Sequence, residues 1–242
     1  MTQSALIIGA GDATGGAIAR AFAREGLIAC VNRRARNADK LEQLAQSIRN
    51  EGHQAMAFPG DAREEEEMAA LIDRVEAEAG PLAVAVFNIG ANVNFPITET
   101  SARVYRKVWE MACFGGFLMG REVAKRMEAR GAGTILFTGA TASIRGGAGY
   151  AAFSGAKAAL RMLAQSMARE LGPKGVHVAH VVIDGGIDTE FIRGLRPDFE
   201  DAKAADLLLS PDAIAANYVM LHKQPKSAWT HELDLRPWGE NW

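Results

Sequence analysis

Short apolar runs alternate along the chain with longer segments of helical periodicity, and this alternation limits the folds open to it. The apolar runs cover residues 5–8, 27–31, 55–58, 82–87, 134–138 and 176–183, with a last one around 231–235. The helical patterns cover residues 15–25, 38–50, 64–78, 101–130, 151–171 and 211–222. Strands that alternate with helices predict a parallel sheet with helices on both faces. We therefore expect one α/β domain over residues 1–242, with a doubly wound parallel sheet of about seven strands.

Composition excludes several classes of partner. The formal net charge of −2 offers no basic excess for nucleic acid or an anionic membrane surface. No apolar stretch reaches the ~18 residues of a membrane span, and residues 1–4 lack the basic start of a secretory signal. The two cysteines, Cys30 and Cys113, form neither a disulfide framework nor a zinc-binding spacing. We expect a cytoplasmic protein with no metal and a small-molecule substrate.

A glycine-rich turn directly follows the first expected strand. It runs Gly9-Ala10-Gly11-Asp12-Ala13-Thr14-Gly15 and leads into the first expected helix. Such a turn lets backbone N–H groups and the helix dipole approach a pyrophosphate. The turn predicts a nucleotide cradle that includes Gly9, Gly11, Ala13 and Gly15; a tight turn without a ligand is the alternative.

With this turn, the chain resembles the short-chain dehydrogenase/reductase family nearly from end to end. The family's turn is similar to TGxxxGxG, in which Gly9 and Gly15 fill the first and third glycine positions. Ile8 replaces the threonine, and Ala13 adds a methyl group at the middle glycine, which alters the phosphate contact. The resemblance implies a Rossmann-type fold, a nicotinamide dinucleotide cofactor and a homodimer or homotetramer.

The end of the second expected strand bears on the choice of cofactor. An acidic residue about 20 residues after the glycine turn would bind the ribose 2′-hydroxyl of NAD. Asn32 occupies that position and is neutral, and Arg33 follows as a planar donor suited to a phosphate. This pattern favours NADP(H) over NAD(H), although Asp12 lies where many NADP-dependent relatives carry a basic residue. A solvated turn is the alternative for Arg33.

The resemblance implies further cofactor contacts after the third and fourth strands. Asp61 matches the aspartate that caps the adenine amino group, and Ala62 lies beside it. The segment Phe87-Asn88-Ile89-Gly90 resembles an NNAG motif, which makes Asn88 and Gly90 cofactor-binding positions.

After the sixth strand, Asp184-Gly185-Gly186-Ile187-Asp188-Thr189 resembles the family's PGxxxT segment. The resemblance brings Ile187 and Thr189 to the nicotinamide carboxamide, whereas Asp184 replaces the proline. Substrate contacts are expected from about residues 189–209.

The standard branch of the family uses Asn, Ser, Tyr and Lys, with the Tyr and Lys one helical turn apart. Lys157 matches the lysine, which binds the nicotinamide ribose. Phe153, Ala140 and Ala112 stand at the Tyr, Ser and Asn positions. A phenyl ring cannot donate a proton, so the standard tetrad cannot operate.

Tyr150 is a second candidate for the missing acid. It precedes Lys157 by seven residues, or about two helical turns, so both can share one helix face. The spacing resembles that of the enoyl-thioester reductases of the same superfamily, where a Tyr assists reduction of a C=C bond. Thr138, Thr141 and Ser143 could each substitute for the missing serine, and Ser143 is preferred because of its reach. The alternative for Tyr150 is an aromatic residue at a loop–helix junction without a catalytic role. The alternative for the three hydroxyl residues is an ordinary role in the turn.

These residues predict an NADP(H)-dependent oxidoreductase that transfers hydride to or from a carbonyl or an activated C=C bond of a small organic substrate. Its catalytic residues are Lys157, Tyr150 and Ser143. The alternative is a catalytically impaired NADP(H)-binding sensor or scaffold. A cofactor-free lyase similar to the halohydrin dehalogenases is disfavoured, because Phe153 and Lys157 do not match their Tyr–Arg pair.

Overall fold

Seven parallel strands form one sheet in the computed structural model, which describes residues 2–240. The strands are β1 (Ser4–Ile8), β2 (Ile28–Arg33), β3 (Ala55–Pro59), β4 (Leu82–Phe87), β5 (Gly133–Thr138), β6 (Val176–Ile183) and β7 (Glu232–Leu235). Their order is β3-β2-β1-β4-β5-β6-β7, and every neighbouring pair is parallel. The order reverses between β1 and β4, which confirms the predicted Rossmann-type sheet.

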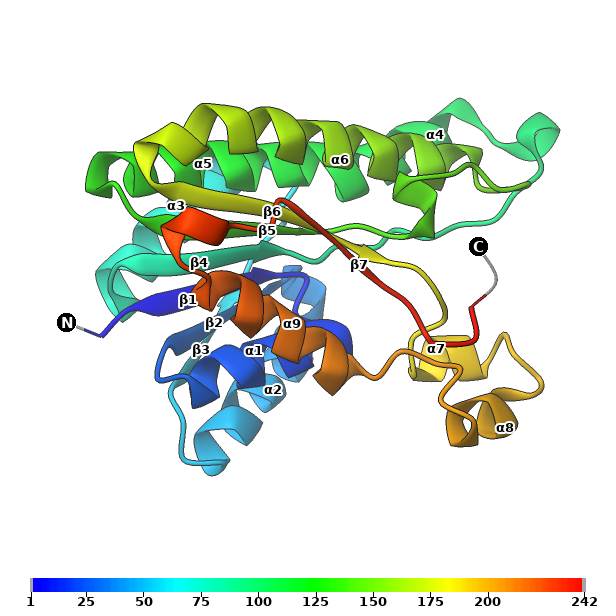
Figure 1. Ribbon diagram of the computed structural model, residues 1–242, viewed down its shortest axis with the longest axis horizontal. Helices are drawn as coiled ribbons and strands as arrows, with labels where there is room; N and C mark the ends of the chain where they lie inside the picture. The colour runs from blue at the N-terminus through cyan, green and yellow to red at the C-terminus, as the bar shows by residue number, and fades with distance from the viewer. Residues whose placement is uncertain (1, 241–242) are drawn as a thin grey trace.

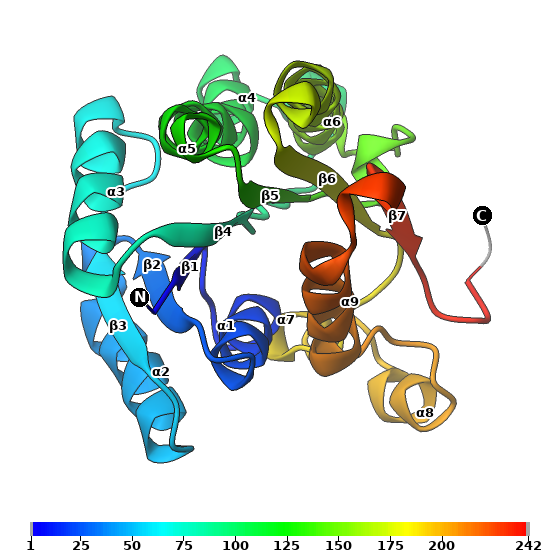
Figure 2. The same ribbon diagram turned by 60° about the vertical axis from the view of Figure 1, so that its left-hand side comes forward.

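Helices cover both faces of this sheet (Figures 1 and 2). One face carries α1 (Thr14–Arg24), α2 (Ala38–Asn50) and α9 (Pro211–Lys223). The other carries α3 (Glu65–Ala79), α4 (Ala102–Trp109), α5 (Gly115–Arg130) and α6 (Ala151–Leu171). Two short helices, α7 (Glu190–Arg193) and α8 (Phe199–Ala204), follow β6 and lie apart from both layers.

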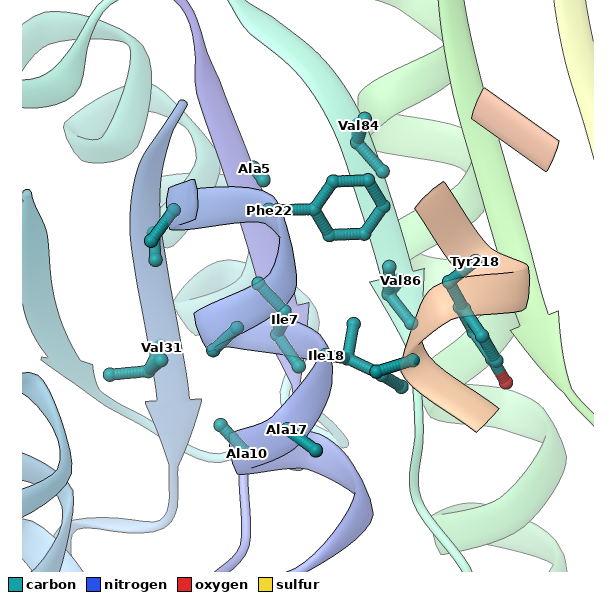
Figure 3. Packing of buried hydrophobic residues seen from close by; sticks show 14 of the residues in the cluster. Ala5, Ile7, Ala10, Ala17, Ile18, Phe22, Val31, Val84, Val86 and Tyr218 are labelled. Carbon is teal, nitrogen blue, oxygen red and sulfur yellow. The ribbon is translucent and has the colours of Figure 1, made fainter. Parts of the chain in front are cut away.

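The central strands are buried on both faces because helices pack against each. Every residue of β4 and of β6 is buried, as expected for parallel strands that read as continuous apolar runs. Figure 3 shows the core between the sheet, α1 and α9, where Phe22 of α1 lies beside Val84 of β4. Ile18 of α1 lies near Val86 of β4 and Tyr218 of α9. These contacts fix the start of α1 against the end of β1, and thus the shape of the glycine turn.

The stretch 101–130, expected to be one long helical segment, is interrupted. The five residues Glu110–Phe114 form a π-helical segment between α4 and α5. A π segment accommodates an extra residue in the turn and is common at functional sites. It buries Ala112 and Cys113, so this wider turn faces the interior. Apolar periodicity cannot reveal such a change, because the flanking turns keep their helical pattern.

The part of the chain that the structure describes contains no helix both long enough and apolar enough to cross a membrane.

Phe22 provides a test of the α1–sheet–α9 core. Its side chain is fully buried, so Phe22→Ala should lower the free energy of unfolding by about 3–5 kcal/mol. Arg24→Ala on the same helix removes a half-exposed side chain with one long ion pair to Glu51, and should cost less than ~1 kcal/mol. Urea denaturation of both variants gives the two values. Similar losses would contradict this packing.

Candidate active site

The carboxyl ends of β1, β4, β5 and β6 surround a cavity of about 1120 Å³. It brings together ten of the residues predicted from sequence: Gly9, Gly11, Ala13, Gly15, Asn88, Gly90, Tyr150, Lys157, Ile187 and Thr189. Five other predicted residues, all described by the structure, are not part of its wall: Asn32, Arg33, Asp61, Ala62 and Ser143. The cavity therefore collects the glycine turn, the lysine and the segment after β6 in one space.

The glycine turn has the shape of a phosphate cradle. Gly9 has a φ of +84°, which favours glycine, and a Cβ there would lie 2.9 Å from the Asn88 carbonyl oxygen. A Cβ on Gly15 would lie 2.5 Å from the Gly9 carbonyl oxygen, so α1 packs against the turn only with glycine there. At Gly11, within the described part of the chain, nothing lies within 4 Å of a Cβ.

The start of α1 leaves donors for an anion. Its N-cap is Ala13, and no side chain of residues 2–240 caps the helix there. The first N–H groups of a helix lack partners within the helix and carry the positive end of its dipole. These donors and the open space at Gly11 fit the pyrophosphate of a dinucleotide. Ala13 itself lines the cavity and does not close it.

Asn88 connects the glycine turn to the ends of β4 and β5. Its Nδ2 donates to the Gly9 carbonyl at 3.2 Å, and its Oδ1 accepts from Thr138 Oγ1 at 3.0 Å. Thr138 Oγ1 also lies 2.7 Å from the hydroxyl of Tyr218. Because the Thr138 proton goes to Asn88, the Tyr218 hydroxyl donates to Thr138. No motif marks Tyr218, which by periodicity is a core residue of α9.

Asn32 is structural in this arrangement. Its side chain is almost fully buried and donates to the carbonyls of Phe58 at 2.8 Å and Gly60 at 3.3 Å. Its own carbonyl accepts from the N–H groups of Gly9 and Ala10, each at 3.1 Å. Asn32 therefore joins the ends of β2 and β3 to the glycine turn.

Two arginine–aspartate pairs lie at the ends of β2 and β3; Asp12 lines the cavity, whereas Arg33, Asp61 and Arg63 lie outside its wall. Arg33 Nη1 is 3.2 Å from Asp12 Oδ1. Arg63 binds Asp61 through two bonds, of 2.9 and 2.5 Å. These bonds from Arg63 hold the pKa of the Asp61 carboxyl below its usual range. A ligand that uses Arg33 or Asp61 must compete with these pairs.

Lys157 is a buried cation held by backbone carbonyls. Its side chain is 1% exposed, and Nζ donates to Thr138 O at 2.7 Å and to Ile89 O at 2.9 Å. The structure, over residues 2–240, pairs it with no carboxylate. Burial lowers the pKa of Lys157 from 10.5 to about 7. An ammonium has three donors, so one remains for a ligand in the cavity.

Apolar side chains surround Lys157 where the resemblance suggested polar ones. Phe153, one turn before Lys157 on α6, lies with its ring centroid 5.9 Å from Nζ. It is buried in one cluster with Ala112, and Ala140 packs against that cluster. Ala112 belongs to the π segment between α4 and α5, and its side chain packs in this cluster. No side chain among these three can donate or accept a proton.

Tyr150 is the N-cap residue of α6 and lines the cavity. Its ring packs over Gly147, where an added Cβ would lie 3.2 Å from Cδ2. The structure gives the Tyr150 hydroxyl no hydrogen bond to any residue between 2 and 240, so this donor is available to a ligand. Tyr150 and Lys157 thus contribute a phenol and an ammonium to the same space.

The hydroxyls after β5 already have partners. Thr141 Oγ1 donates to Asp184 at 2.6 Å. Ser143 is 4% exposed, and its Oγ accepts from the Ala140 N–H at 2.9 Å, which closes a 3₁₀ turn. The Asp184 side chain is 1% exposed, with Arg145 and Arg236 as the nearest cations. Ser143 thus faces the turn rather than the cavity.

Lys157 yields a prediction on pH. With its pKa lowered to about 7, the unfolded chain binds this proton more tightly than the folded chain between pH 7 and 10.5. The free energy of unfolding should therefore rise with pH across that window. Between pH 7 and 9 we expect it to rise by about 1–2 kcal/mol more in the wild type than in Lys157→Met. Urea titrations at both pH values measure this. Equal slopes would mean that the two carbonyls keep Lys157 protonated.

A model of the family described as short chain dehydrogenase matches residues 3–200. The cis-4-hydroxycyclohexanecarboxylate dehydrogenase of Sinomonas cyclohexanicum is 33% identical over 202 residues, which cover 83% of this chain and 80% of the relative. The 2,3-dihydro-2,3-dihydroxybenzoate dehydrogenase of Bacillus subtilis (strain 168) is 30% identical over 200 residues, with coverages of 82% and 75%.

A solved structure is similar over almost the whole chain. The short-chain dehydrogenase from Rhodopseudomonas palustris is 48% identical, with a TM-score of 0.83 and coverage of 98% of this chain and 99% of that one. Together with the family match over residues 3–200, this similarity shows that the chain belongs to the short-chain dehydrogenase family of oxidoreductases.

Proposed function

We propose that the protein is an NADP(H)-dependent oxidoreductase that reduces or forms a carbonyl, or reduces an activated C=C bond, in a small organic substrate. The observation that carries this proposal is the single cavity that joins the glycine cradle, the buried Lys157 and the free hydroxyl of Tyr150. Its size suits a nucleotide together with a small substrate, since it exceeds the volume of an ordinary ligand pocket.

The cofactor, when bound, supplies or accepts the hydride. The N–H groups at the start of α1 and the open space at Gly11 would hold its pyrophosphate. Asn88 stabilises the glycine turn by donating a hydrogen bond to the Gly9 carbonyl. The third donor of Lys157 would bind the nicotinamide ribose, and Ile187 and Thr189 would border the nicotinamide.

Tyr150 is the proposed proton donor. In reduction, its phenol gives a proton to the substrate oxygen, or holds the oxygen of a developing enolate; in oxidation it takes the proton back. Lys157 lines the same cavity and is kept for the nicotinamide ribose. Ser143 Oγ accepts from the Ala140 N–H and Ser143 does not line the cavity, so we assign the proton transfer to Tyr150 alone.

Two relatives suggest where to look for a substrate. The enzymes of Sinomonas cyclohexanicum and Bacillus subtilis are, by their names, dehydrogenases of ring alcohols that carry a carboxylate. A hydroxylated cyclic acid is therefore the first class of compound to assay with this protein.

Cofactor choice is tested at Arg33 and Asp12. A 2′-phosphate would take up the Arg33 guanidinium, so Arg33→Ala should weaken NADPH binding about tenfold or more and leave NADH binding unchanged. Asp12→Asn should strengthen NADPH binding, because it removes a carboxylate that competes for Arg33 and repels phosphate. Calorimetric titration with both nucleotides measures this. Arg36→Ala, on the same turn, is the matched control. An equal loss for NADPH and NADH would exclude an NADP preference set by Arg33.

The catalytic role of Tyr150 is tested with cis-4-hydroxycyclohexanecarboxylate and related hydroxy acids. Tyr150→Phe should lower kcat about 100-fold or more, since it removes the proton donor, and should leave nucleotide binding intact. Tyr105→Phe is the control, because Tyr105 lies on α4 outside the cavity wall. Unchanged turnover in Tyr150→Phe would rule out this assignment.

One observation favours a second candidate, a nucleotide-binding protein without redox turnover. The side chains of Phe153, Ala112 and Ala140, which stand at the family's catalytic positions, have no proton to transfer. Tight NADPH binding, with no substrate-dependent oxidation of NADPH across the same set of compounds, would select this candidate.

A further inference from the structure

Arg145 lines the cavity from the segment between β5 and α6. Its main-chain N–H donates to the Thr141 carbonyl at 3.1 Å, which fixes its backbone at the end of a 3₁₀ turn. Gly146 and Gly147 follow, and the Tyr150 ring packs over Gly147. Arg145, Gly147 and Tyr150 all line the cavity. The segment therefore places a guanidinium and the proposed proton donor on one wall.

The other basic side chains in the cavity wall have close partners. Arg20 binds Glu51 at 2.8 Å, Lys203 binds Asp188 at 2.8 Å, and Arg193 binds both Glu190 and Glu200. Lys157 donates to two carbonyls. Arg145 has a single contact, from Nη2 to Asp184 Oδ1 at 3.5 Å, and its side chain is 42% exposed. A guanidinium has five N–H donors, so most of those of Arg145 are open to a ligand.

Asp184 does not use up the charge of Arg145. This carboxylate accepts a much shorter bond from Thr141, at 2.6 Å, and Arg236 lies 3.8 Å from its other oxygen. Asp184 is 1% exposed and is not part of the cavity wall, whereas Arg145 is. A ligand in the cavity thus meets the cation and not its counter-ion.

The acidic residues of the wall leave this end positive. Asp12, Asp188 and Glu190 are each paired with a basic residue. Asp212 belongs to the first turn of α9, on the opposite face of the sheet from α6. The stretch from residue 139 to Lys157, which contains Tyr150, has Arg145 and Lys157 as its basic residues and no carboxylate.

We propose that Arg145 binds a carboxylate on the substrate and orients the reacting carbon beside Tyr150. A planar guanidinium matches a carboxylate through two parallel hydrogen bonds, which fix orientation as well as position. The inference rests on the proposed function for the identity of the reaction, but the carboxylate site itself requires only the cavity and Arg145. The substrate class is thus a small organic acid that bears the carbonyl or alcohol at a distance from its carboxylate.

A matched pair of neutral and charged probes tests this. Cyclohexanecarboxylate and cyclohexanecarboxamide have nearly the same shape, and only the first has a charge for Arg145. Calorimetric titration at saturating NADP⁺ should show the carboxylate binding about tenfold or more tightly than the carboxamide. Arg145→Gln should make the two probes equal, and Arg145→Lys should keep part of the preference. Arg169→Gln, which removes an exposed arginine of α6 outside the cavity wall, should keep the wild-type ratio.

The outcomes separate this inference from a structural role and from the proposed reaction. If Arg145 serves only Asp184, Arg145→Gln will lower the thermal midpoint while the preference for carboxylate persists, and the inference is overturned. Equal binding of both probes to the wild type, or no carboxylate binding at millimolar concentration, overturns it too. The same titrations without nucleotide address the cofactor separately. A carboxylate preference in a protein that binds no NADP⁺ would refute the proposed function and leave the Arg145 site standing.

Discussion

The two bonds from Lys157 to backbone carbonyls organise the site and the segments around it. The lysine extends from α6, and its acceptors are Ile89, just after β4, and Thr138, the last residue of β5. A buried ammonium without these acceptors would cost several kcal/mol in desolvation. The bonds therefore fix the ends of two central strands and the first turns of α6 relative to one another. The cavity is the space left beside this junction.

The second fixed point is the close approach of α1 to the glycine turn, and Asn88 connects the two. Its amide donates to Gly9 and accepts from Thr138, the residue whose carbonyl holds Lys157. The cradle and the lysine thus share one hydrogen-bond network. Tyr218 anchors that network from α9, on the far side of the sheet. This explains how the helix that packs on α1 also supports the floor of the cavity.

The part of the cavity near Lys157 combines an apolar cluster with polar side chains from the segment before α6. Phe153 and Ala112 form an apolar cluster beside Lys157, and apolar surroundings strengthen charge interactions. The polar groups that face the cavity, Tyr150 and Arg145, come instead from the glycine-rich segment before α6. At the other end, Arg33 and Arg63 are already paired with aspartates. Binding at that end exchanges one ion pair for another, so its net gain is smaller than a new ion pair would give.

The sequence by itself determined the succession of strands and helices along the chain. Buried parallel strands are continuous apolar runs, and helices show apolar stripes with a period of 3.6 residues. It also located the glycine turn and Lys157, since each depends on residue types that few other positions tolerate. It did not determine the partners of polar groups. The sequence predicts a site role for Asn32 and Ser143, and the structure adds that their side chains bond to backbone groups brought near by neighbouring strands and turns. Arg145, Tyr218 and the π segment carry no local signal. Their roles depend on contacts between residues 39 to 80 positions apart, such as Arg145 with Asp184 and Thr138 with Tyr218, and only the tertiary structure decides those.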